Sequence, residues 1–314
     1  MGTPIIEQQI YLLERYSSKE YFGLMRDAFK AMVKAGYAAL DEFMLHLPRD
    51  YRSREQWEQP DIAWGEEALP NLSGTEMYLD VAWEKLEVGD FSGLRSANDV
   101  SSDFLGMHDG FTIDWMPEPF RTEFDAKGKL AVRLNSGICD TVNRNVRFGS
   151  LYYPTWQEEK EEPWWSRRWG NFPPPKTWPI YRLNPEVQVN TDETVKHTGI
   201  YLPAVDRSCP QFMYAGAEVW KADIGSYPDE VIEQATLWTL VERVADEGGE
   251  VPGQERWRSD TGPNRCEGGQ PCPQEGNWWT PAADPGTGYF KKGDVMPNYP
   301  ASTYGATIWY RVKE

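Results

Sequence analysis

The sequence predicts an α+β protein: a mainly helical N-terminal part, followed by a mixed part with small antiparallel β units. Apolar residues recur every three or four positions through much of the first 147 residues, which is the period of an amphipathic helix. Beyond that point the chain is rich in proline, glycine and tryptophan, and short apolar runs alternate with turn residues. We therefore divide it into a helical domain (1–147), an aromatic and proline-rich connector (148–186) and a mixed domain (187–314).

The helical pattern is strongest over residues 5–48. It is interrupted at Ser17-Ser18, where a serine can cap the start of a second helix, and Pro48 ends it. Further helices are expected at 75–87, 96–107 and 118–137.

The mixed domain contains a weak internal repeat. Gly199–Pro203 is followed by Phe212, and Gly276–Pro281 is followed by Phe290; in both copies the Phe lies nine positions after the Pro. A Gly, alternating large side chains and a turn predict a small antiparallel SH3-like unit in each copy. Chance similarity of two segments rich in Gly and Pro is the alternative. A helix is expected between the two units, at 229–247, because apolar residues recur on one face before Gly248-Gly249.

Composition restricts the possible partners and location. The 314 residues carry a formal net charge of −17, and a field of that sign repels nucleic acids and anionic membranes but attracts a basic protein. No apolar run approaches the roughly 18 residues of a membrane span, and the first residues lack the pattern of a signal peptide. A cytoplasmic location is therefore expected. Aromatic residues make up 14% of the chain, which excludes a disordered protein.

No arrangement of residues predicts an enzyme. The three histidines, His46, His108 and His197, lie in unrelated contexts, and no nucleophile elbow, phosphate-binding loop or dinucleotide fingerprint is present. Cys266 and Cys272 lie close in sequence, but no further Cys or His nearby completes a zinc site, so they are interpreted as small residues of a turn. Neither catalysis nor a metal nor a cofactor is expected.

One stretch of the connector is the candidate partner-binding site. Carboxylates can steer a basic partner, and aromatic side chains can anchor it once buried. A solvated connector face is the alternative interpretation. The candidate residues are Glu158, Glu159, Glu161, Glu162, Trp164 and Trp165.

The C-terminal part resembles a known group of proteins. It contains Cys272-Pro273-x-x-Gly276-x-Trp278, then Phe290-x-x-Gly293-Asp294-x-Met296-Pro297, and a closing segment Gly305–Tyr310 with Trp309. This pattern is similar to the C-terminal signature of bacterial polymorphic-toxin immunity proteins, many of them associated with type VI secretion. The resemblance covers about residues 148–314 and carries over no functional residue.

The resemblance implies a cytosolic protein that binds and neutralises a cognate antibacterial toxin, covering an active-site cleft that is often basic. A different function class stays open from the residues themselves. A carbohydrate-binding or carbohydrate-active protein would stack sugars on exposed tryptophans and use paired carboxylates, and both residue types are abundant here.

Overall fold

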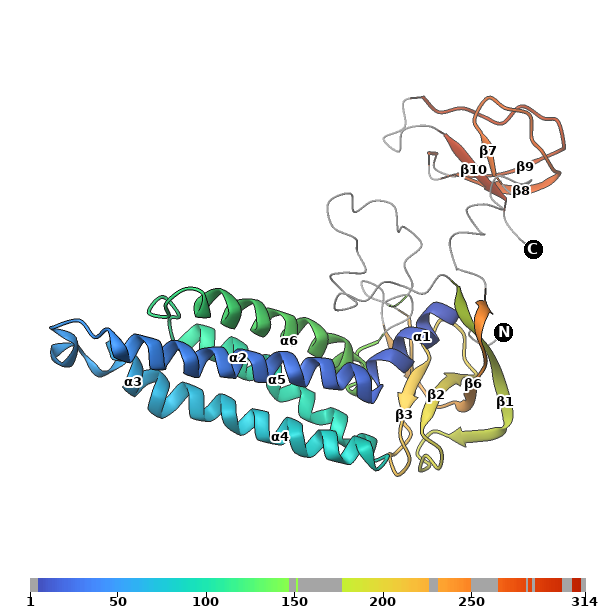
Figure 1. Ribbon diagram of the computed structural model, residues 1–314. Coiled ribbons are helices and arrows are strands. Elements are labelled where there is room, and N and C mark those ends of the chain that lie inside the picture. The colour runs from blue at the N-terminus through green and yellow to red at the C-terminus, as the bar shows by residue number, and fades with distance from the viewer. Residues whose placement is uncertain are drawn as a thin grey trace. The chain divides into compact units, whose positions relative to one another are not determined.

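The computed structural model describes residues 5–146, 151, 177–225, 231–249, 265–280, 282–283, 286–300 and 307–311 (Figure 1). It confirms the α+β class, with helices in the N-terminal part and antiparallel sheets in the C-terminal part. The chain forms two compact units, Met1–Gly249 and Glu250–Glu314. Among the described residues, the first unit holds all the helices and one β module, so its limits differ from the division predicted at residues 147 and 186.

In the N-terminal part, a helix lies at each position where the sequence predicts one, with most bounds shifted by a few residues, but the helix predicted at 75–87 begins at Pro60. Ser18 caps the second helix, because its side chain accepts a hydrogen bond from the backbone N–H of Tyr21 (3.2 Å). In order, the helical elements are α1 (Glu7–Tyr16), α2 (Lys19–Leu45), η1 (Tyr51–Ser53), η2 (Gln56–Glu58), α3 (Pro60–Ile62), η3 (Ala63–Ala68), α4 (Leu69–Glu87), η4 (Phe91–Ala97), α5 (Asn98–Gly110) and α6 (Phe120–Val142).

Helices α2, α4, α5 and α6 run side by side and bury the larger core of the first unit (Figure 1). Buried aromatic side chains dominate that core, among them Phe22, Phe29 and Phe124. The approach of α6 to its neighbours is close. An added Cβ at Gly128 would lie 2.0 Å from the Phe104 ring, so only a glycine fits there.

The strands form two four-stranded antiparallel sheets and a separate hairpin. The first β module has the order β1-β6-β2-β3, the second has β7-β10-β8-β9, and β4 pairs with β5. The bounds are β1 (Trp178–Asn190), β2 (Gly199–Pro203), β3 (Gln211–Met213), β4 (Ala222–Ile224), β5 (Ile232–Gln234), β6 (Leu237–Gly249), β7 (Arg265–Glu267), β8 (Gly276–Trp279), β9 (Thr287–Phe290) and β10 (Ile308–Arg311).

The helix predicted at 229–247 is wrong: this region contains β5 and the long strand β6. Strand β6 lies between β1 and β2, and its Trp238 and Val241 are both buried although they point to opposite faces. Over residues 237–241 the strand is at least partly buried on both faces, so apolar and polar residues do not alternate there as they do in a strand with one exposed face. Its apolar residues then fit a helical period equally well.

The predicted connector is also partly wrong, because residues 178–186 belong to β1. Trp178 and Tyr181 of this strand are buried. The sequence places these aromatic residues in the connector, but in the structure their side chains pack β1 against the helical part. The rings of Tyr11 and Trp178 lie 5.3 Å apart.

Glu14 of α1 joins the helices to the first β module. It accepts a hydrogen bond from the Tyr181 hydroxyl (2.6 Å), and its carboxylate lies 3.4 Å from the Arg243 guanidinium. Burial raises the pKa of Glu14, while Tyr181 and Arg243 partly oppose that shift. The contact is one reason that the first module and the helices form one compact unit.

The two β modules are copies of one structure, which confirms that the repeat is real. Val195 and Cys272, 77 positions apart, hold equivalent positions in the two modules. The backbone N–H of each donates to the carbonyl of a turn residue, Ala217 or Asp294. The carbonyl of each accepts a hydrogen bond from the preceding glycine of that turn, Gly216 or Gly293, which has a positive φ. The glycine-to-carbonyl distances are 2.9 and 2.8 Å. Side-chain hydrogen bonds repeat as well. The indole N–H of Trp238 donates to the Trp220 carbonyl, and that of Trp309 donates to the Pro297 carbonyl.

The hydrophobic cores correspond position by position. The first module buries a cluster of seven side chains, and every one has a counterpart in the second. The pairs are Val189 and Cys266, Val195 and Cys272, Tyr201 and Trp278, Met213 and Phe290, Val219 and Met296, Ala222 and Tyr299, and Trp238 and Trp309. Phe290 therefore matches Met213, one position from the Phe212 with which the sequence pattern aligned it.

The duplication explains the two cysteines. Cys266 and Cys272 are free and buried, and they occupy the places of two valines in the first module. Burial raises the pKa of the Cys266 thiol, which keeps it protonated. Both residues therefore act as small apolar core side chains.

Replacing both cysteines with valine should leave the second module folded. Val is larger than Cys by only about one methyl group and is equally apolar, and near-isosteric exchanges in a core cost less than about 1.5 kcal/mol each. Thermal unfolding of the full chain, with and without the two substitutions, measures the difference. Loss of the second module in the double variant would contradict the assignment of these thiols to an apolar core.

Candidate binding surfaces

The partner-binding residues predicted from sequence lie outside the described residues. This applies to Glu158, Glu159, Glu161, Glu162, Trp164 and Trp165, so their role stays a prediction. The described residues contain two other surfaces suited to binding. One is a sheet face of the second module, and the other is a pocket in the helical part.

In the first module the outward face of β2 and β3 is covered by helices. Ile200, Leu202 and Phe212 point away from the module's own core, yet all three are buried. The Phe212 ring packs against Phe91 of η4, with centroids 5.8 Å apart, and α1 crosses the same strands (Figure 1). Strand β2 is consequently buried on both faces.

The equivalent face of the second module is exposed and aromatic. Trp279 takes the place of Leu202 and is 45% exposed, and Tyr289 takes the place of Phe212 and is 58% exposed. Tyr310 lies beside Trp279, with ring centroids 6.1 Å apart. Only the inward side chain of β8, Trp278, is fully buried. Trp and Tyr are the side chains most often found at the energetic centre of protein interfaces.

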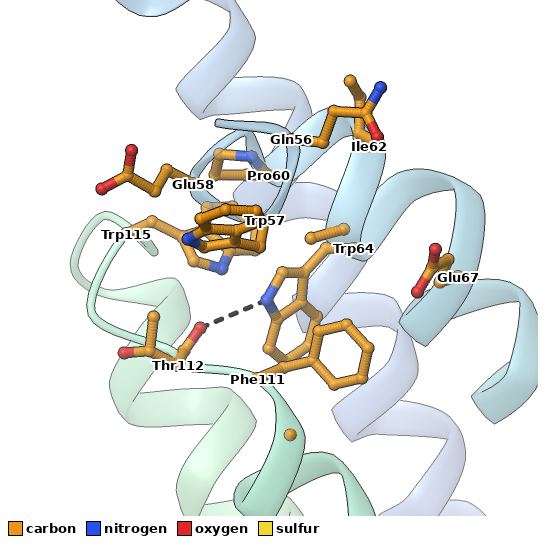
Figure 2. Close-up of a pocket in the computed structure, with 12 residues that line it drawn as sticks. Gln56, Trp57, Glu58, Pro60, Ile62, Trp64, Glu67, Phe111, Thr112 and Trp115 are labelled. Carbon is orange, nitrogen blue, oxygen red and sulfur yellow. Dashed lines mark hydrogen bonds between the residues drawn. The ribbon is translucent and has the colours of Figure 1, made fainter. Parts of the chain in front are cut away.

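The pocket lies where η2, α3 and η3 meet the loop after α5 (Figure 2). Its volume is about 400 Å³, and its aromatic walls are Trp57, Trp64, Phe111 and Trp115. The rings of Trp64 and Trp115 meet edge to face, with centroids 5.5 Å apart and an interplanar angle of 62°. The Trp64 indole donates its N–H to the backbone carbonyl of Thr112 (3.2 Å), which fixes its orientation (Figure 2).

A widened helical turn forms one wall of the pocket. Residues 60–87 run as one continuous helix in which η3 is a π-helical segment. Pro70 lies two positions after this segment; it cannot donate a backbone hydrogen bond, and its ring would clash with the carbonyl four positions earlier. The wider π turn relieves that clash. It also holds Trp64, which is buried, and Glu67, which is exposed, at the pocket.

The segments that line the pocket are acidic. Residues 55–67 and 109–118 contain eight Asp or Glu and no Lys or Arg. Two of the eight are neutralised by nearby arginines: Asp61 by Arg52 at 2.7 Å, and Glu118 by Arg121 at 2.8 Å. Within the described ranges the other six form no ion pair with Lys or Arg. They are Glu55, Glu58, Glu66, Glu67, Asp109 and Asp114.

Sequence reasoning missed both surfaces. The pocket residues are distributed over two segments that are about 50 positions apart, and no spacing signal connects them. The acidic bias of residues 55–67 around two tryptophans was a usable signal, of the same kind that drew attention to the connector. The sheet face has no sequence signal of its own, because it is defined by the difference between equivalent residues of the two modules.

The described residues offer no evident centre for catalysis. His46 lies at the end of α2, His108 packs on Phe104 within α5, and His197 lies in a loop of the first module. Among the residues described, no three His, Cys, Asp or Glu side chains are grouped to hold a metal ion. Of the described helices, none has the length and apolar character needed to cross a membrane.

Comparisons with protein-family models, with curated proteins and with solved structures found no match to this chain.

Proposed function

We propose that the protein is an immunity protein, which binds a cognate antibacterial toxin and blocks it without catalysis of its own. One observation carries the proposal: the second module exposes aromatic side chains at the positions that its copy buries under helices. A face that is covered in one copy and aromatic in the other is suited to covering by a partner.

Two further features support the same function. The C-terminal part of the chain resembles polymorphic-toxin immunity proteins in the segments around Trp278, Met296 and Trp309. In the structure these three residues form the core of the second module, so the resemblance concerns its scaffold. The net charge of −17 favours rapid association with a basic protein surface, such as the cleft of an enzyme that acts on nucleic acids or nucleotides.

The test uses the open reading frame that neighbours the gene of this protein. Co-expression of the protein is expected to rescue cells from the toxic C-terminal domain of that neighbour, and the two proteins are expected to co-purify. Replacing both Trp279 and Tyr289 with alanine should weaken the complex about 30-fold or more, since aromatic hot spots contribute about 2 kcal/mol or more. Rising salt should slow association, because exposed charges are screened over about 8 Å at physiological ionic strength.

Trp220→Ala is the matched control. Trp220 is 54% exposed, similar to Trp279, but it lies in the first module at a position unrelated to the outward sheet face. This variant should bind the toxin as tightly as the unmodified chain. Equal losses in both variants would contradict the role of the sheet face, and absence of rescue by any neighbour would overturn the immunity function.

Carbohydrate binding remains the second candidate, and the pocket of Figure 2 is the observation that favours it. Tryptophan faces stack on sugar rings, and Glu58 and Glu67 lie on opposite sides of the indoles (Figure 2). The excess of negative charge around this pocket adds little to the binding free energy of a neutral sugar. It adds much more to that of a positively charged ligand.

A further inference from the structure

We propose that the pocket of Figure 2 binds an arginine side chain carried by a protein partner. The inference deepens the proposed function and rests on it only for the identity of the partner. It assigns a ligand class to a site in the first unit, separate from the sheet face of the second module.

The aromatic walls suit a flat cation. A guanidinium is attracted to the face of a tryptophan ring within about 6 Å of its centre, and arginine makes this contact more often than lysine does. Trp57 is 74% exposed and offers an accessible indole at the pocket. Trp64 is buried, and its hydrogen bond to Thr112 holds it in place, so the inner wall needs little reorganisation when a ligand binds.

The charge of the walls selects a cation over a neutral ligand. Glu58 and Glu67 line the pocket, and both are exposed and have no ion pair with Lys or Arg among the described residues. A carboxylate can accept two parallel hydrogen bonds from a guanidinium, which makes the contact geometrically specific. The eight acidic residues of the two lining segments, with no basic residue among them, add a wider attractive field.

The size of the pocket indicates that the arginine belongs to a polypeptide. A volume of about 400 Å³ exceeds what a single side chain fills, and it leaves room for adjoining backbone.

Isothermal titration of the full chain with an acetylated, amidated tetra-arginine peptide tests the proposal. We expect saturable binding that weakens with salt, and weaker binding of the matching tetralysine peptide. Trp57→Ala and the double variant Glu58→Gln/Glu67→Gln should each lower the affinity at least five-fold. Glutamine at position 58 retains an acceptor for the backbone N–H of Glu55, so the local turn is preserved.

Trp220→Ala serves as the control, since it removes an exposed tryptophan that does not line the pocket and should leave peptide binding unchanged. Equal affinities for the unmodified chain and both pocket variants would overturn the proposal. So would binding of cellotetraose at this pocket in place of the peptide. Because the peptide assay contains no toxin, a failed toxin rescue with intact peptide binding would overturn only the immunity function. The reverse result would overturn only the arginine site.

Discussion

Replacing Trp278 with alanine is expected to unfold the second β module while the first unit stays folded. Trp278 is fully buried in the core of that module, and its indole N–H donates to the Gln274 carbonyl (3.1 Å). Truncating a buried tryptophan costs about 3–5 kcal/mol. A single core in a unit of this size, Glu250–Glu314, rarely supplies more than about 3–5 kcal/mol in total. Calorimetry of the full chain should therefore lose one of two unfolding transitions.

The neighbouring residue provides the control for this experiment. Trp279 lies in the same strand but points to the opposite face and is 45% exposed. Trp279→Ala should retain both transitions, with a change in stability below about 1 kcal/mol, because it leaves no cavity in the core. Similar losses from the two substitutions would show that the assigned faces of β8 are wrong.

Gly128→Ala is expected to destabilise the helical part by about 1–3 kcal/mol, although alanine is intrinsically the better helix former. The new methyl group would lie 2.0 Å from the Phe104 ring and 2.8 Å from the Met32 sulfur. Helices α5 and α2 would have to move away from α6 to accept it. Chemical denaturation followed by far-UV circular dichroism measures the loss.

Gly74→Ala makes the same chemical change without the clash. Gly74 lies inside α4, and no atom comes within 4 Å of an added Cβ. The variant should gain about 0.5–1 kcal/mol, because alanine loses less backbone entropy in a helix. We therefore expect the free energy of unfolding to fall in Gly128→Ala and to rise in Gly74→Ala. Destabilisation of similar size at both sites would point to a general intolerance of the helices and would contradict the packing argument.

The sequence was informative where one face of an element meets water. The helices of the N-terminal part have a polar outer side, so their apolar period identified them and the capping role of Ser18. The first five residues of strand β6, 237–241, are at least partly buried on both faces, and the apolar residues of this strand led to a false helix. The same cause concealed the start of β1, where Trp178 and Tyr181 are both buried.

Only part of the repeat could be predicted from the sequence. Glycines such as Gly199 and Gly276 identified it, since an added Cβ at either position would lie close to a side chain of the neighbouring strand, 2.5 Å from Leu240 and 3.0 Å from Arg311. The cores diverged beyond recognition in sequence, because only their joint volume is constrained and a Tyr201 can stand where a Trp278 stands. Binding surfaces are harder to predict from sequence. Leu202 and Trp279 differ in exposure at equivalent positions, and that equivalence is known only from the pairing of the strands.

The duplication also has a consequence for how the chain folds. Two modules with the same strand order in one polypeptide can exchange strands, and such misassembly is a characteristic failure of repeat proteins. In this protein the different core side chains of the two modules oppose such an exchange of strands. Were β8 to replace β2, the bulk of Trp278 would enter a space shaped for Tyr201, and the polar Asn277 would be driven beneath the helices in place of Ile200. This hybrid carries an overpacked core and a buried amide, so the divergence of the two copies disfavours the exchange of β8 for β2.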